Sequence, residues 1–268
     1  MKIGKTMPPD RILSLSDREP LDLWCAYPED VLDVATADAC LSLLSEDERA
    51  RWRAFRFDRQ RREYLTTHAL VRTALSHYYP TVPKAWRFET NAYGKPRVKP
   101  DCGLRFNLSN SPDLVVCLIA YGSEVGVDIE PYERAEKIVE LAPEVFSPVE
   151  VTHLEALHGP EKLDRALSLW TLKEAYIKAT GMGLSQPLKQ FFFLFGGKEG
   201  IRLEFDPLLD DQPVQRWRIC LLEHARHRIA LMVEGTNVPE LKLWEARPLL
   251  AIPKELSPRR EQWSSPSA

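Results

Sequence analysis

The chain has 268 residues, of which 44% are hydrophobic and 28% are charged, so it can bury a sizeable core in one large or two small domains. The formal net charge of −3 argues against a protein that binds polyanions over its whole surface. The sequence shows no apolar leader and no run approaching the ~18 apolar residues of a membrane span, and its five cysteines have neither zinc nor disulfide spacing, so we expect a cytoplasmic protein without a membrane partner.

The first part of the chain is predicted to contain a strand and two helices. Residues 1–20 carry prolines and charges and favour irregular structure, whereas residues 21–27 have the apolar pattern of a strand and residues 31–44 that of a helix. Ser45 and Glu48 have the spacing of a capping box, in which each side chain bonds the backbone N–H of the other residue. They predict the start of a second helix.

A strongly basic segment with interleaved aromatic residues follows. Residues 49–62 include seven arginines, with Trp52, Phe55 and Phe57 among them. The pattern fits a solvated basic helix face over an aromatic seam, a phosphate site, or a surface for single-stranded nucleic acid. The acidic balance of the whole chain weakens the last interpretation, and we expect no nucleic acid as a partner.

Two short motifs are predicted to lie at turns. Residues 64–79 form an amphipathic helical pattern, after which the sequence Y-G-K-P occupies positions 93–96 and F-N-L-S-N occupies positions 106–110. The first motif reads as a turn, and the second as a strand that runs into a turn. Each is a weak signal by itself.

A hairpin with two carboxylates comes next. Residues 114–120 are predicted to be a buried strand, and residues 125–131 alternate apolar positions with Asp128 and Glu130. The period of two places both acids on one strand face, where they repel each other. Either water screens them, or a hard cation such as Mg²⁺ lies between them.

The longest predicted helix carries a third carboxylate. Asp164 is the expected N-cap and Gly181 the expected stop signal. Trp170, Glu174 and Lys178 are four residues apart, so they lie along one line of the helix. Glu174 and Lys178 can form a surface ion pair worth about 0.2–0.5 kcal/mol, or they can serve a site.

The remaining chain is predicted to complete a sheet. Strand patterns occur at residues 191–195, 201–205, 214–220 and 229–233. Residues 248–268 are rich in proline, serine and arginine, and we expect a mobile tail.

Two segments together carry a specific resemblance. G-V-D-I-E at residues 126–130 is followed, after about forty residues, by W-T-L-K-E-A-Y-I-K at residues 170–178. This combination resembles the 4′-phosphopantetheinyl transferases of the Sfp type. The resemblance implies an α+β fold of two similar α/β halves that form an intramolecular pseudo-dimer, with the active site between them. We divide the chain into residues 1–123, residues 124–247 and the tail; the repeat itself is not visible in the sequence.

The resemblance also implies an activity and a metal site. Such enzymes move the 4′-phosphopantetheine arm of coenzyme A to a serine of an apo acyl or peptidyl carrier protein and release adenosine 3′,5′-bisphosphate. By this resemblance Asp128, Glu130 and Glu174 hold Mg²⁺ or Mn²⁺. Glu174 accepts the serine proton, Lys178 stabilises or protonates the leaving phosphate oxygen, and Asp128 completes the catalytic group. No step requires a second subunit, so we expect a monomer.

The coenzyme A contacts that the resemblance implies extend over both halves. They are Arg51, Lys95, Pro96, Ser109, Asn110, Lys173 and Lys178. Asn110 departs from the family pattern, which has a histidine that contacts the 3′-phosphate. Asparagine can donate a hydrogen bond to phosphate but cannot carry the charge of a protonated histidine, so we expect a weaker grip on that phosphate.

Three alternatives make different predictions. A non-catalytic relative that binds coenzyme A or a carrier protein is consistent with Asn110. A Mg²⁺-dependent phosphatase or nuclease could use the same acids with water as the nucleophile. A nucleic-acid-binding protein predicts steep salt dependence and indifference to chelators.

Overall fold

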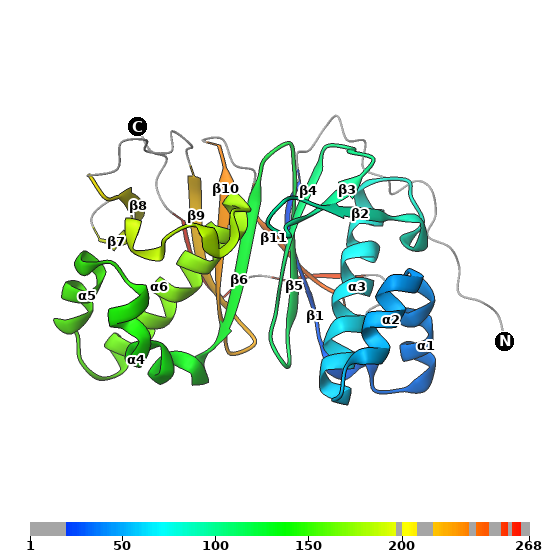
Figure 1. Cartoon of the computed structure of the whole chain (residues 1–268), viewed down its shortest axis with the longest axis horizontal. Coiled ribbons are helices and arrows are strands. Elements are labelled where there is room, and N and C mark those ends of the chain that lie inside the picture. Colours follow the sequence, from blue (N-terminus) through cyan, green and yellow to red (C-terminus); the bar gives the residue numbers. More distant parts are fainter. Residues whose placement is uncertain are drawn as a thin grey trace.

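The structure is a computed structural model that describes residues 20–196, 200–207, 217–235, 240–246, 253–256 and 259–263. It shows an α+β architecture with two sheets in the middle of the molecule and helices on both outer sides (Figure 1). No helix within these ranges is both long enough and apolar enough to cross a membrane.

The first half of the chain forms helices over one sheet. Its helices are α1 (Val34–Leu43), α2 (Glu46–Ala54) and α3 (Asp58–Tyr78). Its strands are β1 (Leu21–Ala26), β2 (Arg87–Thr90), β3 (Pro96–Lys99), β4 (Leu104–Asn110) and β5 (Val115–Tyr121). The predicted capping box at the start of α2 is confirmed, because the Ser45 and Glu48 side chains each accept a hydrogen bond from the backbone of the other residue.

The second half repeats this arrangement. Its helices are α4 (Ala135–Val145), α5 (Pro148–Glu155) and α6 (Gly159–Thr180). Its strands are β6 (Val125–Pro131), β7 (Phe191–Phe195), β8 (Ile201–Phe205), β9 (Trp217–His224) and β10 (His227–Glu234). Short 3-10 helices connect elements at Pro28–Val31, Pro83–Ala85, Tyr132–Arg134, Gly183–Ser185 and Leu188–Gln190.

The strand order reveals the internal repeat that the sequence hides. In the first sheet β5 lies between β1 and β4, and in the second sheet β10 lies between β6 and β9, with all of these pairs antiparallel. A long helix, α3 or α6, follows the first strand of each half, and a two-stranded sheet, β2–β3 or β7–β8, follows that helix. The predicted α+β fold of two similar halves is confirmed.

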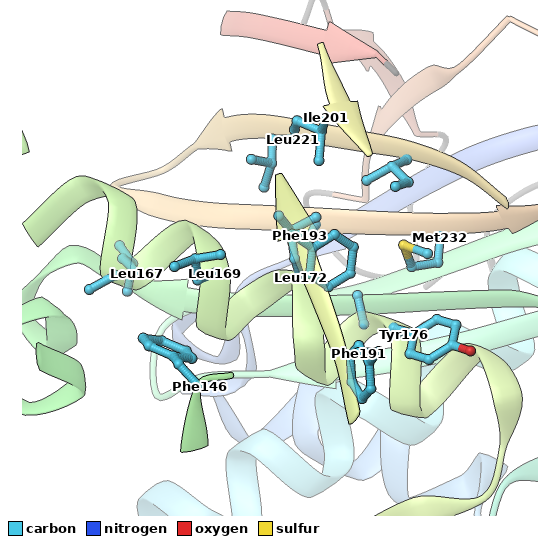
Figure 2. Close-up of a cluster of buried hydrophobic side chains, with 14 of the residues drawn as sticks. Phe146, Leu167, Leu169, Leu172, Tyr176, Phe191, Phe193, Ile201, Leu221 and Met232 are labelled. Carbon is cyan, nitrogen blue, oxygen red and sulfur yellow. The ribbon is translucent and has the colours of Figure 1, made fainter. Parts of the chain in front are cut away.

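Apolar side chains fill three layers of core. One cluster lies between α3 and the first sheet, and a second lies between α6 and the second sheet. Figure 2 shows part of the second cluster, in which Tyr176 and Leu172 of α6 lie beside Phe191 of β7 and Met232 of β10. The third cluster joins the two sheets, and Val127 of β6 belongs to it. The alternation in β6 therefore directs its carboxylates away from the contact between the sheets and toward α6.

The C-terminal strands connect the two sheets. β11 (Lys242–Glu245) lies parallel to β1 and antiparallel to β12 (Lys254–Leu256) in the first sheet. β13 (Arg259–Trp263) pairs with β9 in the second sheet. Part of the tail that we expected to be mobile thus forms strands, and the rest of it lies outside the described residues. The division at residue 124 remains a prediction.

The start of α6 differs from the sequence-based prediction. The helix begins at Gly159, with Pro160 in its first turn, and Asp164 is therefore inside the helix and not its N-cap. Proline favours the first turn because its missing N–H has no helical partner there. Asp164 instead forms an ion pair with Arg228 of β10. Gly181 ends the helix in a left-handed conformation, as predicted.

Candidate active site

A glycine lets the central strand and helix approach each other closely. A Cβ atom at Gly126 of β6 would lie 2.1 Å from the backbone oxygen of Ala175 and 2.5 Å from the backbone nitrogen of Ala179, both in α6. Any side chain at this position would push the helix from the strand. The glycine of the G-V-D-I-E motif therefore brings Glu174 and Lys178 of α6 close to Asp128 of β6.

One edge of β6 pairs with β10, and side chains from the first half bond the backbone at its opposite edge. Asn107 Oδ1 of β4 accepts a hydrogen bond from the backbone N–H of Val127 at 2.9 Å, and Ser109 Oγ accepts one from that of Ile129 at 3.2 Å. These contacts satisfy edge groups that a strand in a sheet would otherwise satisfy. They place the carboxylates of β6 at the contact between the two halves.

Asp128 is the centre of the polar cluster. It is only 5% exposed, and its Oδ1 accepts hydrogen bonds from Ser109 Oγ at 2.9 Å and from Lys178 Nζ at 2.7 Å. Its Oδ2 is buried without a hydrogen-bond partner in the described structure. An unsatisfied buried carboxylate oxygen is costly, and it is a donor atom that a hard cation prefers.

Glu130 lies on the same strand face and has two partners. Its Oε1 accepts a hydrogen bond from Trp170 Nε1 at 2.7 Å, and Arg134 Nη1 lies 2.6 Å from both carboxylate oxygens. Burial and the nearby charge of Asp128 raise the pKa of Glu130. The hydrogen bond from Trp170 fixes the position of the Glu130 carboxylate. The helical spacing of Trp170 did not predict this role.

Glu174 faces both of these acids from α6. The pKa of Glu174 is raised, mainly by burial and then by the charge of Asp128, and the charge of Lys178 partly offsets this rise. Repulsion from the Asp128 charge contributes to the raised pKa of both Glu130 and Glu174, so the three acids form a like-charge cluster, which a cation stabilises. No group of three or more acidic, histidine or cysteine side chains among the described residues is arranged to hold a metal ion as it stands. The partnerless Asp128 oxygen and the all-oxygen donor set nevertheless fit Mg²⁺.

Two lysines that the family resemblance assigned to coenzyme A binding are buried, and their ammonium groups bond other groups of the protein. Lys95 Nζ donates to Glu124 at 2.7 Å and to the backbone oxygens of Val125 and Ala179. Its side chain is 7% exposed, so it fastens the β2–β3 turn to the strand and helix of the site. The ammonium group has no free donor for the adenine nucleotide in this arrangement.

Lys173 points into the core of the second half. Its side chain is 0% exposed, and its Nζ lies 2.9 Å from Glu150 and donates to the backbone oxygens of Leu188 and Phe191. Adjacent helix residues point about 100° apart, so Lys173 and Glu174 face different surroundings. This position does not agree with the expected phosphate contact. Glu150, which forms the capping box of α5 with Ser147, also holds this buried lysine.

The other sequence-based candidates lie in the first half. Arg51 is exposed on α2, Pro96 begins β3, and Asn110 is exposed at the end of β4, next to Ser109. Arg72 of α3 is 2% exposed and forms an ion pair with Glu48 at 2.7 Å. Arg72 therefore stabilises the packing of α2 on α3.

Comparison with known proteins identifies the class. A family model described as the 4′-phosphopantetheinyl transferase superfamily matches residues 124–232, which contain β6, α6 and all three carboxylates. A 4′-phosphopantetheinyl transferase of Bacillus subtilis is 30% identical over 171 residues, which cover 64% of this chain and 75% of that protein. HetI of Nostoc is 33% identical over 181 residues, covering 66% and 75% respectively.

These matches show the family of the chain. The Sfp protein of Bacillus subtilis strain 168 is 31% identical over 172 residues, with 64% of this chain and 75% of that protein covered. The chain belongs to the 4′-phosphopantetheinyl transferase family. Among solved structures, a holo-(acyl-carrier-protein) synthase of Bacillus anthracis in complex with CoA (3′,5′-ADP) is 19% identical, with a TM-score of 0.35, and covers 41% of this chain and 94% of that one.

Proposed function

We propose that this chain transfers the 4′-phosphopantetheine arm of coenzyme A to the serine of an apo acyl or peptidyl carrier protein in a Mg²⁺-dependent reaction. The observation that carries the proposal is the cluster at the contact of the two halves. There Asp128, held by Ser109 and Lys178, keeps one buried oxygen without a partner beside Glu130 and Glu174. Family membership supports the same chemistry.

The carboxylates are proposed to hold the metal. Asp128, Glu130 and Glu174 offer oxygen donors, and when bound a Mg²⁺ ion neutralises the diphosphate of coenzyme A. Glu174 faces Asp128 from α6 and lies one helical turn from Lys178, so we propose it as the carboxylate that accepts the serine proton. Mn²⁺ has similar ligand preferences and is expected to substitute.

The proton and bond changes balance with these residues. The serine oxygen forms a bond to the phosphorus that carries the pantetheine arm, and its proton passes to Glu174. The bond from that phosphorus to the bridging oxygen breaks, and adenosine 3′,5′-bisphosphate leaves. Lys178, whose ammonium is 2.7 Å from Asp128, is placed to stabilise or protonate the leaving oxygen.

Contacts to coenzyme A form a further part of the proposal. Arg51, Pro96, Ser109 and Asn110 remain the proposed contacts, together with Lys178. Ser109 of β4 donates a hydrogen bond to Asp128 through its hydroxyl group, next to Asn110. The buried partners of Lys95 and Lys173 support a structural role for those lysines, and we leave them out of the binding site.

We further propose a cytoplasmic monomer. None of the five cysteines is in a disulfide, which is usual in a reducing compartment. The two halves of one chain already enclose the acid cluster, because β4 of the first half contacts Asp128 of the second. The experiment that tests this function is intact-mass measurement of several apo carrier proteins after incubation with the enzyme, coenzyme A and Mg²⁺.

Wild type is expected to add one phosphopantetheine mass, and a chelator is expected to abolish the gain. An Asn110→His variant, run in parallel, separates the alternatives. If neither protein modifies any carrier, the chain is a non-catalytic relative. If only the histidine variant does, Asn110 disables an otherwise intact site.

A further inference from the structure

Arg134 is a second cation, besides Lys178, among the carboxylates of Asp128, Glu130 and Glu174. It follows β6 at the end of the 3-10 helix Tyr132–Arg134, and its Nη1 lies 2.6 Å from both oxygens of Glu130. The Glu130 side chain is 7% exposed, whereas that of Arg134 is 45% exposed. A single nitrogen serves both oxygens, unlike the two-nitrogen fork of the strongest arginine–carboxylate pairs. The guanidinium can therefore leave toward solvent while the carboxylate stays.

Glu130 does not depend on Arg134 for its position. Trp170 Nε1 donates to Glu130 Oε1 at 2.7 Å, and the backbone of Glu130 is paired with Arg228 of β10, one residue before the end of a regular antiparallel ladder. The strand and the indole group hold the carboxylate from two directions. Loss of the arginine contact would free Oε2 of Glu130 while Trp170 still holds Oε1, so the side chain would keep its position.

The charges in the cluster are nearly balanced by side chains alone. Lys178 contacts Asp128 at 2.7 Å and Arg134 contacts Glu130 at 2.6 Å, so two of three carboxylates already have a cation. A divalent ion that binds Glu130 must compete with the guanidinium for the same oxygens. Once displaced, this partly exposed guanidinium keeps its charge and its planar set of donors, which suit phosphate oxygens.

We propose that Arg134 is a resident counter-cation of the metal site, which neutralises Glu130 before metal binding, yields its oxygens to the divalent ion and then contacts the diphosphate of coenzyme A. This inference rests on the proposed function. It makes Arg134 an exchangeable cation rather than a fixed scaffold for Glu130. The two roles predict opposite effects on metal affinity when the arginine is removed.

The test measures the affinity of the full chain for Mn²⁺ without coenzyme A, with electron paramagnetic resonance to detect the free and bound ion. Arg134→Ala is expected to bind Mn²⁺ about tenfold more tightly, because a competing positive charge is gone. Arg134→Lys, which keeps the charge, should lie near wild type. Trp170→Phe should bind Mn²⁺ more weakly, because Glu130 loses the group that positions it.

Arg226→Ala is the matched control. Arg226 pairs with Glu133 at the surface, where the two side chains are 82% and 61% exposed, and its removal should leave Mn²⁺ affinity unchanged. Equal or weaker Mn²⁺ binding by a folded Arg134→Ala protein would overturn the proposal and make Arg134 a scaffold. Thermal unfolding of each variant establishes that it is folded.

Coenzyme A completes the test. Arg134→Ala should raise the KM for coenzyme A about tenfold with a smaller change in kcat, as expected for a lost phosphate contact. An unchanged KM would overturn the second part of the proposal. Absence of transfer by wild type would refute the proposed function, whereas the Mn²⁺ measurements would still decide whether Arg134 competes with the metal.

Discussion

Replacement of Gly126 by alanine tests how the strand and helix are brought together. The added Cβ would lie 2.1 Å from the Ala175 backbone oxygen, about 1.3 Å short of the 3.4 Å at which ordinary contact begins. The nearest atoms belong to the helix backbone, so a side-chain rotation cannot relieve the overlap. Gly126 does not have a positive φ angle, so any loss in the variant comes from this contact and not from backbone strain.

The magnitude follows from the required movement. Overpacking of this kind costs about 1–3 kcal/mol, and displacement of catalytic groups by about 1 Å can reduce a rate about 100-fold. We therefore expect Gly126→Ala to lower the melting temperature by several degrees and to lower the transfer rate of the folded protein by about two orders of magnitude. The assays are thermal unfolding and carrier-protein modification well below the melting temperature.

Val127→Ala is the control for general destabilisation. Val127 is fully buried between the sheets and points away from α6, so its truncation should lower stability while the folded protein keeps its rate. If Gly126→Ala keeps the wild-type melting temperature and rate, or loses no more activity than Val127→Ala, the account of the strand–helix contact is wrong.

Three further changes test the roles assigned to single residues. Lys173→Met should destabilise the protein by about 3–5 kcal/mol in chemical denaturation, because it leaves Glu150 as a buried charge without a cation. Adding Glu150→Gln to this variant should restore part of the lost stability. A rate defect without loss of stability would contradict the structural role of Lys173. Asn110→His should lower the KM for coenzyme A, and lower it less for a 3′-dephospho analogue; equal effects on both would exclude a contact with the 3′-phosphate. Asp22→Asn should stabilise the protein at neutral pH, because burial raises the pKa of Asp22 and the amide oxygen can still accept a hydrogen bond from Tyr78. Because the pKa of Asp22 is raised, the folded state binds the proton more tightly than the unfolded state does. The stability of the wild type therefore falls as the pH rises through the folded-state pKa. The difference in stability between the variant and wild type should disappear in acid.

The sequence predicts the parts of the site that depend on local pattern. Alternation in β6 places Asp128 and Glu130 on one face, and the four-residue spacing in α6 aligns Glu174 with Lys178 and Trp170. These relations hold in the structure because they depend only on the periods of strand and helix. The capping box at Ser45 is confirmed for the same reason.

Long-range partners could not be predicted from these patterns. Lys95 and Lys173 look like free cations in the sequence, yet carbonyl groups and acids from distant segments surround both ammonium groups. The repeat of the two halves also escaped detection, because it resides in strand order and not in side-chain identity. Asn107 gave no signal, since its role is to satisfy the edge of a strand from the other half.

Glu174→Ala tests whether the three carboxylates form the active site, through the rate and the stability of the variant compared with wild type. We expect a large loss of phosphopantetheine transfer to an apo carrier protein, measured by intact mass, with a melting temperature close to that of wild type. Glu174 is half-buried and its raised pKa shows that burial of its charge carries a cost, so removal of the carboxylate should not destabilise the fold. A lower melting temperature with an undiminished rate would contradict the assignment of this cluster as the active site.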